Sequence, residues 1–230
     1  MGVTTGKRNV TEPEAFALLG QFGLPIVPHA AAFTADEAAA AADRLGYPVA
    51  LKVVSPDILH KTDVGGVALN LADGEAVRRA FADIQAKARA ANPGADLRGV
   101  LVARMAAAGP EVIVGVARDA QFGPAVMFGL GGIFVEVYKD VAFRLPPLSE
   151  ADARDMIQEI RGLPILTGFR GRPPCDLQAI ANCLLAVSRL VEARPDLDEL
   201  DLNPILAYPT GCLVVDAKLV LKAEHATPHT

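Results

Sequence analysis

One apolar segment and the loop after it hold the residues best suited to phosphate chemistry. Lys52 lies within Val49–Val54, where the alternation of a β-strand would set it opposite the valine and leucine side chains. If its face is solvated, Lys52 is an ordinary surface charge. If its face is enclosed, the ammonium group needs an anion beside it, and a nucleotide phosphate is a natural one.

The following loop, Ser55–Val67, combines an imidazole, a lysine, carboxylates and a Gly-Gly pair. His60 could act as a nucleophile and carry a phosphoryl group, because one ring nitrogen is free at neutral pH. A structural role for a loop histidine stays open as the alternative. Gly65 and Gly66 could let backbone N–H groups approach an anion closely.

Oxygen ligands for a hard cation occur near the C-terminus. Asp201 and Asn203 stand two apart in a strand-like segment, and Asp216 follows thirteen residues after Asn203. Magnesium prefers a few such donors with room left for water and phosphate. The alternative is that these are ordinary turn and edge residues.

A glycine-rich stretch, Phe128–Gly132, follows another apolar segment and superficially resembles loops that hold phosphate. It has neither the G-x-G-x-x-G spacing of a dinucleotide site nor the lysine of a P-loop. The stretch therefore supports neither a Rossmann site nor a Walker site.

The elements that must position these residues alternate between helix and strand. Helix-start signals, with an N-capping side chain and an acidic or proline residue in the first turn, predict five helices, beginning at Thr11, Thr34, Asp73, Ser149 and Asp176. β-Branched runs predict strands at 48–54, 66–71, 99–105, 111–117, 124–129, 204–208 and 213–216. We expect two α+β lobes, residues 11–105 and 106–222, with flexible ends at 1–10 and 223–230.

The composition excludes several classes of protein. The chain has 230 residues, 51% of them hydrophobic, and a formal net charge of −5, which argues against a broad basic surface for nucleic acid. Its most apolar stretch, 120–135, is too short and too interrupted to span a membrane. The N-terminus has no signal-peptide core, and the three cysteines show no C-x-x-C spacing, so a cytoplasmic protein with reduced thiols is expected.

Five segments together resemble the β subunit of acetate–CoA ligase (ADP-forming) and its fused relatives, in the expected order from about Thr11 to Lys222. They are ILHKTDVGGV, EVIVGVARDAQFGPAVMFGLGG, FRLPPLSEADA, ELDLNPIL and VDAK. The resemblance implies a mixed α+β (α/β) ATP-grasp fold, in which ATP or ADP binds with Mg²⁺ in a cleft between the two lobes.

By the same resemblance, Lys52 contacts the α and β phosphates, and Glu111 lies on the nucleotide side, at the ribose. Met105 belongs to the adenine-facing hinge, where Ala103 stands in place of the Gln or Glu of many relatives. Asn203 and Asp216 hold magnesium.

The resemblance also implies a reaction shared by two subunits. His60 would receive a phosphoryl group from a phosphohistidine on a CoA-binding α subunit, in an α2β2 assembly, and pass it to ADP. Arg144 matches an arginine of the family, and our own hypothesis is that it guides the phosphorylated segment. The alternative is a nucleotide-sensing ATP-grasp domain of a larger fused protein, such as a synthetase-like acetyltransferase; a purely structural subunit is a third reading.

Overall fold

The computed structural model describes residues 6–132 and 140–222. The chain forms two compact units that interleave along the sequence. Unit 1 comprises Met1–Val10, Leu18–Pro25 and Ala108–Thr230, and unit 2 comprises Thr11–Ala17 and Ile26–Ala107. Each unit has its own sheet.

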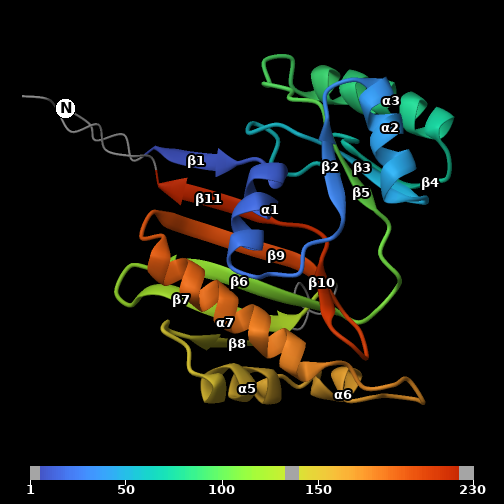
Figure 1. Ribbon diagram of the computed structural model, residues 1–230. Helices are drawn as coiled ribbons and strands as arrows, with labels where there is room; N and C mark the ends of the chain where they lie inside the picture. The colour runs from blue at the N-terminus through green and yellow to red at the C-terminus, as the bar shows by residue number, and fades with distance from the viewer. Residues whose placement is uncertain (1–5, 133–139, 223–230) are drawn as a thin grey trace, which may run out of the picture. The chain divides into compact units, whose positions relative to one another are not determined.

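Unit 2 contains a four-stranded antiparallel sheet in the order β2-β5-β3-β4. Its strands are β2 (His29–Ala32), β3 (Val49–Val53), β4 (Val67–Leu71) and β5 (Val100–Arg104). Helices α2 (Ala35–Leu45) and α3 (Gly74–Ala91) pack against each other and cover one face of this sheet (Figure 1).

The sequence of β3 explains how this sheet is buried. Val49, Leu51 and Val53 enter the core that the sheet shares with α2 and α3. Lys52 alternates to the other face, and it is buried there as well. The small alanines along α2 allow that helix to lie close to the sheet.

The predicted helix-start signals operate as N-caps. The Thr34 side chain accepts the Glu37 N–H, and Asp73 accepts the Ala76 N–H. Helix α1 (Glu12–Gln21) begins where Glu14 accepts hydrogen bonds from the N–H and the hydroxyl of Thr11. This places Glu12 in the first helical turn, where the helix dipole favours a negative charge.

Unit 1 contains a seven-stranded antiparallel sheet in the order β1-β11-β9-β6-β7-β8, with β10 paired to β9. Its strands are β1 (Lys7–Val10), β6 (Glu111–Asp119), β7 (Gly123–Leu130), β8 (Val141–Arg144), β9 (Leu197–Ala207), β10 (Cys212–Val214) and β11 (Lys218–Lys222). Its helices are α5 (Glu150–Glu159), the short α6 (Leu163–Leu166) and α7 (Leu177–Ala193).

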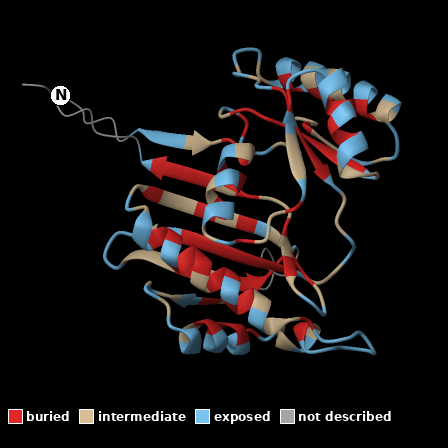
Figure 2. Ribbon diagram, viewed as in Figure 1, coloured by how far each residue is buried: buried red, intermediate tan, exposed pale blue. Residues whose placement is uncertain are grey.

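The core of unit 1 lies between the middle strands of the sheet and the helices on one of its faces. Val114 and Phe128 are fully buried on β6 and β7, and Leu184 and Leu190 are buried on α7. Figure 2 shows buried residues running along β11, β9 and β6. In residues 6–132 and 140–222, no helix combines the length and the hydropathy needed to cross a bilayer.

The units differ from the expected contiguous lobes 11–105 and 106–222. Leu18–Pro25 groups with the C-terminal half. Lys7–Val10, expected within a flexible end, is strand β1, because its backbone pairs with β11 from Lys7 opposite Lys222 to Val10 opposite Leu219. Residues 1–5 and 223–230 of the expected ends lie outside the described residues.

Candidate functional site

Lys52 projects from β3 into an enclosed site and meets a carboxylate. Its Nζ lies 2.7 Å from Glu12 Oε1, and the two side chains are only 9% and 2% exposed. The enclosed alternative for Lys52 is therefore the one observed, with Glu12 as the adjacent anion. Removing one partner of such a buried pair typically costs about 3–5 kcal/mol, because the other charge is left uncompensated.

The same carboxylate also holds a cation from the His60 loop. Lys61 Nζ lies 3.1 Å from Glu12 Oε2, with the Lys61 side chain 17% exposed. One carboxylate on α1 thus joins β3 to the loop that carries His60. Sequence reasoning identified this part of α1 only as a capping box and did not identify Glu12 as the partner of Lys52. The signal for such a partner was that a buried lysine requires an acid.

The Gly65–Gly66 pair has a structural explanation within the loop, and the anion-binding role expected of its amides stays a prediction. The Gly65 N–H donates to the Thr62 carbonyl at 3.0 Å, and the Gly66 N–H donates to the Lys61 carbonyl at 2.7 Å. Gly65 adopts φ +64, which favours glycine. A Cβ on Gly66 would lie 2.6 Å from Val53 Cγ1. Both amides serve the loop itself.

His60 is exposed at the outer part of this loop, and its carbonyl accepts the Asp63 N–H at 3.2 Å. An exposed imidazole beside a tethered lysine is accessible to a phosphoryl donor. The structure does not test the predicted transfer role, which stays a prediction.

Met105 lies just after β5 and is half-buried. Its N–H donates to the Pro48 carbonyl at 2.9 Å. This amide is therefore engaged by the preceding segment of unit 2, and a contact of Met105 with adenine would have to use its carbonyl or its side chain.

In unit 1, Glu111 begins β6 and lines a pocket of about 480 Å³, a volume in the range of small-molecule sites. The Gly131 N–H donates to the Glu111 carbonyl at 2.8 Å, which places the glycine-rich end of β7 beside this carboxylate. Arg170 and Arg172 also line the pocket. Sequence reasoning did not single out these arginines, although a G-F-R-G-R loop offers two cations near phosphate-sized space.

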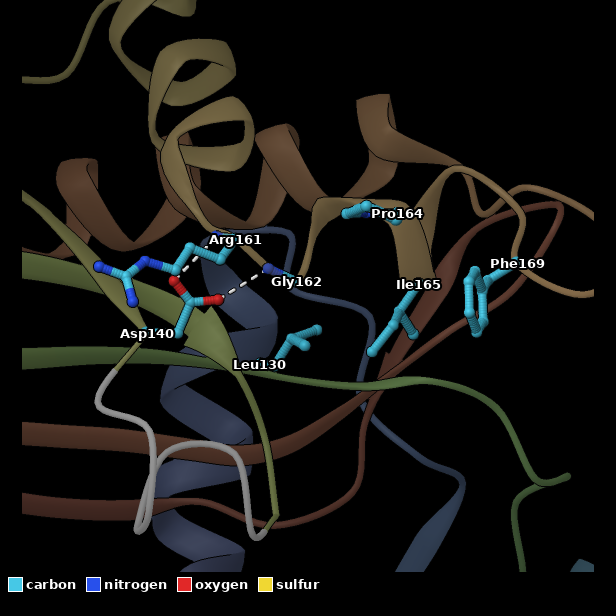
Figure 3. A pocket seen from close by; sticks show the side chains of 7 residues that line it. All are labelled: Leu130, Asp140, Arg161, Gly162, Pro164, Ile165 and Phe169. Atoms are coloured by element: carbon cyan, nitrogen blue, oxygen red, sulfur yellow. Dashed lines mark hydrogen bonds between the residues drawn. The ribbon is translucent and has the colours of Figure 1, made fainter.

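A second pocket, of about 340 Å³, adjoins the first and shares Leu130, Ile165 and Phe169 with it. Figure 3 shows the Asp140 carboxylate turned to the start of α6, where it accepts the N–H groups of Arg161 and Gly162 at 2.8 and 2.7 Å. Because that charge is already satisfied, this pocket offers mainly apolar walls.

Arg144, at the end of β8, forms a forked ion pair with Glu159 on α5 and also donates to the Phe143 carbonyl at 2.8 Å. The hydrogen bond from Arg144 lowers the pKa of the Glu159 carboxyl, and the same bond raises the pKa of Arg144. The guanidinium is thus already used to hold α5 against the sheet. Its predicted guiding role would require exchange of this partner.

The predicted magnesium ligands lie at one region of the unit 1 sheet. Asn203 is exposed on β9, and Asp216 precedes β11. Burial raises the pKa of the Asp201 carboxyl; Lys218 opposes this effect, and the charges of Glu199 and Asp216 add to it. Among the described residues, Asp201 Oδ1 has no hydrogen-bond partner.

This donor set fits magnesium. The described residues contain no group of three His, Cys, Asp or Glu side chains arranged for a metal. Mg²⁺ does not need one, because it commonly binds one or two carboxylates together with substrate phosphates and water. The buried oxygen of Asp201, lacking a partner within the described ranges, is the feature that a cation would satisfy.

Comparison with known proteins decides the family. The family model described as an ATP-grasp domain matches residues 2–221. The chain belongs to the ATP-grasp family. Among its ATP-grasp relatives, the β subunit of acetate–CoA ligase (ADP-forming) I of Pyrococcus furiosus is 47% identical over 214 residues, covering 93% of this chain and 92% of the relative.

Longer ATP-grasp ligases contain the same region. Acetate–CoA ligase (ADP-forming) I of Archaeoglobus fulgidus is 45% identical over 215 residues. The matched region covers 94% of this chain and 31% of that enzyme. Among solved structures, acetyl-CoA synthetase 1 of Ca. Korarchaeum cryptofilum, in complex with coenzyme A and Ca-AMPCP, matches with a TM-score of 0.91 and 44% identity over 94% of both chains. The ATP-grasp fold expected from the sequence is confirmed.

The same Korarchaeum enzyme has also been solved with coenzyme A and Mg-AMPPCP, with its phosphohistidine segment pointing towards the nucleotide binding site. That structure matches with a TM-score of 0.81 and 42% identity over 93% of both chains. The relatives are thus ligases, in which the ATP-grasp region occurs either as a separate β subunit or as part of a longer chain.

Proposed function

We propose that this chain is the nucleotide-binding subunit of an ADP-forming acyl-CoA synthetase. In this function His60 accepts a phosphoryl group from a phosphohistidine of a CoA-binding partner and passes it to ADP. The overall reaction is acyl-CoA + ADP + phosphate giving acid + CoA + ATP. The partner converts acyl-CoA and phosphate into the acid, free CoA and its own phosphohistidine.

The observation that carries the proposal is the shared carboxylate of Glu12. Lys52, the predicted phosphate ligand, and Lys61, the neighbour of His60, contact the two oxygens of this one group. A phosphate-binding cation and the predicted phosphoryl carrier are thereby held on one small frame. The near-complete match to a β subunit and the Mg-AMPPCP complex of the Korarchaeum relative support the same function.

Each residue has a defined task in the proposed transfer. Lys52 neutralises phosphate charge, and the exposed imidazole of His60 provides the nitrogen that bonds to phosphorus while the partner's imidazole leaves. Asn203 and Asp216, with Asp201 beside them, would hold Mg²⁺, which supplies charge neutralisation at the phosphate oxygens. Glu111 and the glycines beside it would face the nucleotide.

The experiment that tests nucleotide binding is calorimetric titration of ADP and ATP into the chain, with and without Mg²⁺. Wild type should bind with a requirement for magnesium, and Lys52→Ala should lose at least tenfold in affinity, as expected for a lost hydrogen bond between charged groups. Equal binding by wild type and Lys52→Ala would contradict the assignment of Lys52.

The second candidate function is that of a nucleotide-sensing domain in a fused protein. It is kept because the chain matches 31% of a longer ligase. A nucleotide-sensing domain would bind ADP or ATP in the same titration, but it would need no phosphoryl-accepting histidine. Incorporation of radioactive phosphate at His60 separates the two functions.

A further inference from the structure

The two adjoining pockets of unit 1 combine apolar walls with cationic side chains. Leu130, Ile165 and Phe169 line both pockets. Arg170 and Arg172 line the larger pocket, of about 480 Å³, beside these apolar residues. The smaller pocket, of about 340 Å³, is also in the size range of small-molecule sites. Together the two pockets fit a small ligand that has an apolar body and an anionic group.

The charged residues of the smaller pocket leave its apolar walls available. Asp140 is its carboxylate among the described lining residues, and it accepts the N–H groups of Arg161 and Gly162 at 2.8 and 2.7 Å. Figure 3 shows the Arg161 guanidinium on the far side of Asp140 from Phe169. The part of the pocket next to Phe169 is therefore suited to a hydrocarbon group.

The loop that carries the two arginines has a defined backbone. The Cys175 N–H donates to the Leu166 carbonyl at 2.7 Å, and the Arg172 N–H donates to the Phe169 carbonyl at 3.2 Å. Arg170 adopts φ +51. A residue other than glycine seldom adopts this conformation unless its surroundings hold it there. The loop thus presents both arginines to the same pocket.

The charges at the larger pocket favour a singly charged anion. Within residues 6–132 and 140–222, neither Arg170 nor Arg172 forms an ion pair; the Arg170 guanidinium lies 5.2 Å from the centroid of the Phe169 ring. A guanidinium offers forked N–H donors that match the two oxygens of a carboxylate. Glu111 lines the same pocket, and its negative charge would repel a second negative charge on a ligand.

The apolar wall lies on the opposite face of the sheet from the predicted magnesium ligands. Leu130 pairs with Val112, and its side chain lies where a Cβ on Gly162, at the start of α6, would meet it at 2.1 Å. Gly115 is three residues after Val112 on β6, so it faces the other side, and it pairs with Asp201. The pocket at Leu130 is therefore separate from the predicted magnesium site.

We propose that the two pockets form an accessory site for an organic acid with an apolar body, such as an aliphatic carboxylate. The carboxylate group meets the guanidinium groups of Arg170 and Arg172. The apolar body packs along Leu130, Ile165 and Phe169. The proposed function assigns the acid to the partner subunit, so this inference goes beyond the proposed function and does not depend on it.

The first experiment is an NMR titration of the isotope-labelled chain with acetate, butanoate, hexanoate and octanoate, without nucleotide or Mg²⁺. Each methylene group that enters the apolar pocket should raise the affinity about fourfold. Hexanamide has the same apolar body as hexanoate but no charge, so it should bind about tenfold more weakly. Hexyl phosphate, with its second negative charge, should bind more weakly than hexanoate.

Variants of the two parts of the site should have different effects. Arg170→Gln and Arg172→Gln should each weaken hexanoate binding about tenfold and leave hexanamide binding unchanged. Phe169→Ala should reduce the gain in affinity per methylene for every acid; Phe169 is 51% exposed, so the variant should fold.

Two exposed residues of the same unit provide matched controls. Phe122 is 68% exposed, and Arg189 is exposed on α7. Neither is among the described residues that line the two pockets. Phe122→Ala and Arg189→Gln should therefore bind every acid as wild type does.

The inference is overturned if wild type binds none of the acids, if hexanoate and hexanamide bind equally, or if both arginine variants bind hexanoate as wild type does. Tighter binding of hexyl phosphate than of hexanoate would exclude the carboxylate class. Competitive displacement of hexanoate by ADP with Mg²⁺ would show a shared nucleotide site, which overturns the inference and leaves the proposed function intact. The expected acid binding without any ADP binding would support the inference and contradict the proposed function.

Discussion

At the scale of single residues, the chemistry depends on which charges have partners. Lys52 is predicted to bind phosphate and Arg144 to guide the phosphorylated segment, yet each meets a carboxylate in this structure, Glu12 and Glu159 respectively. The two pairs differ in exposure: the first is nearly enclosed, and the second is partly open to solvent. A phosphoryl group should therefore replace Glu159 at Arg144 more easily than it replaces Glu12 at Lys52, since exposed ion pairs contribute little stability.

The relay predicts a specific defect in His60→Ala. Because His60 is exposed, its removal should change stability by less than about 0.5 kcal/mol and leave ADP affinity nearly unchanged. Phosphoryl transfer from a phosphorylated partner to ADP should be lost. His60→Gln is the control that keeps a polar side chain without a nucleophilic nitrogen, and wild-type transfer by either variant would exclude the relay.

The magnesium site predicts opposite effects of Asp201→Asn in the presence and absence of metal. Without Mg²⁺ the variant removes a buried charge, so we expect stabilisation by about 1 kcal/mol and a rise in Tm of a few degrees. Lys218 pairs with Glu199, so the change leaves no cation stranded. With Mg²⁺ and ADP the variant should gain less in Tm than wild type. A destabilised variant with an unchanged magnesium titration would contradict the assignment.

At the scale of elements, strand β3 and its loop form the frame of the site. Antiparallel pairing with β4 and β5 places Lys52 opposite Val67 and Leu101. The loop then returns over the strand, where Gly66 contacts both Val53 and the Lys61 carbonyl. The Gly-Gly pair thus acts through close packing and a positive φ at Gly65, while its amides stay within the loop.

This packing predicts that Gly66→Ala is destabilising. The added Cβ would approach Val53 Cγ1 to 2.6 Å and the Lys61 carbonyl oxygen to 2.9 Å, so the loop must shift. We expect a loss of about 1–3 kcal/mol in the free energy of unfolding, measured by urea denaturation, together with weaker ADP binding. Gly94→Ala is the control, because nothing lies within 4 Å of its Cβ. Equal stability of the two variants would contradict the packing argument.

At the scale of the whole molecule, the chain corresponds in length to a β subunit. It covers 92% of the Pyrococcus furiosus β subunit and 31% of the longer Archaeoglobus fulgidus enzyme. A CoA-binding α subunit or domain therefore follows as a proposal. The α2β2 stoichiometry and the cytoplasmic location stay predictions from the sequence.

In the proposed function the partner converts acyl-CoA and phosphate, so the isolated chain should be catalytically incomplete. Supplied with acetyl-CoA, phosphate, ADP and Mg²⁺, it should form no ATP above background in a luciferase assay. Addition of a CoA-binding α subunit from a related ligase, carrying a phosphorylated histidine, should allow ATP formation. ATP formation from acetyl-CoA by the chain alone would contradict the division of labour.

Much of the fold was predictable, because local signals decide where helices begin. The longest strand, β9 (Leu197–Ala207), was predicted only from residue 204. The capping residues Thr34, Asp73 and Ser149 all act as N-caps, since a side chain that accepts a helix N–H needs only its own neighbours. The short strands β1, β2, β8 and β11 were missed. Four or five residues carry little periodicity, and their pairing depends on partners far away in the sequence.

The sequence by itself determined the family and the placement of Lys52 on a strand, and it predicts which residues handle phosphate and magnesium. Only the tertiary structure decided their partners: Glu12 between Lys52 and Lys61, Glu159 on Arg144, and the enclosed oxygen of Asp201. The reason is physical. Residue type fixes what a side chain can bind, but burial and charge partners come from segments that meet only when the chain folds, as Glu12 and Lys52 do across forty positions.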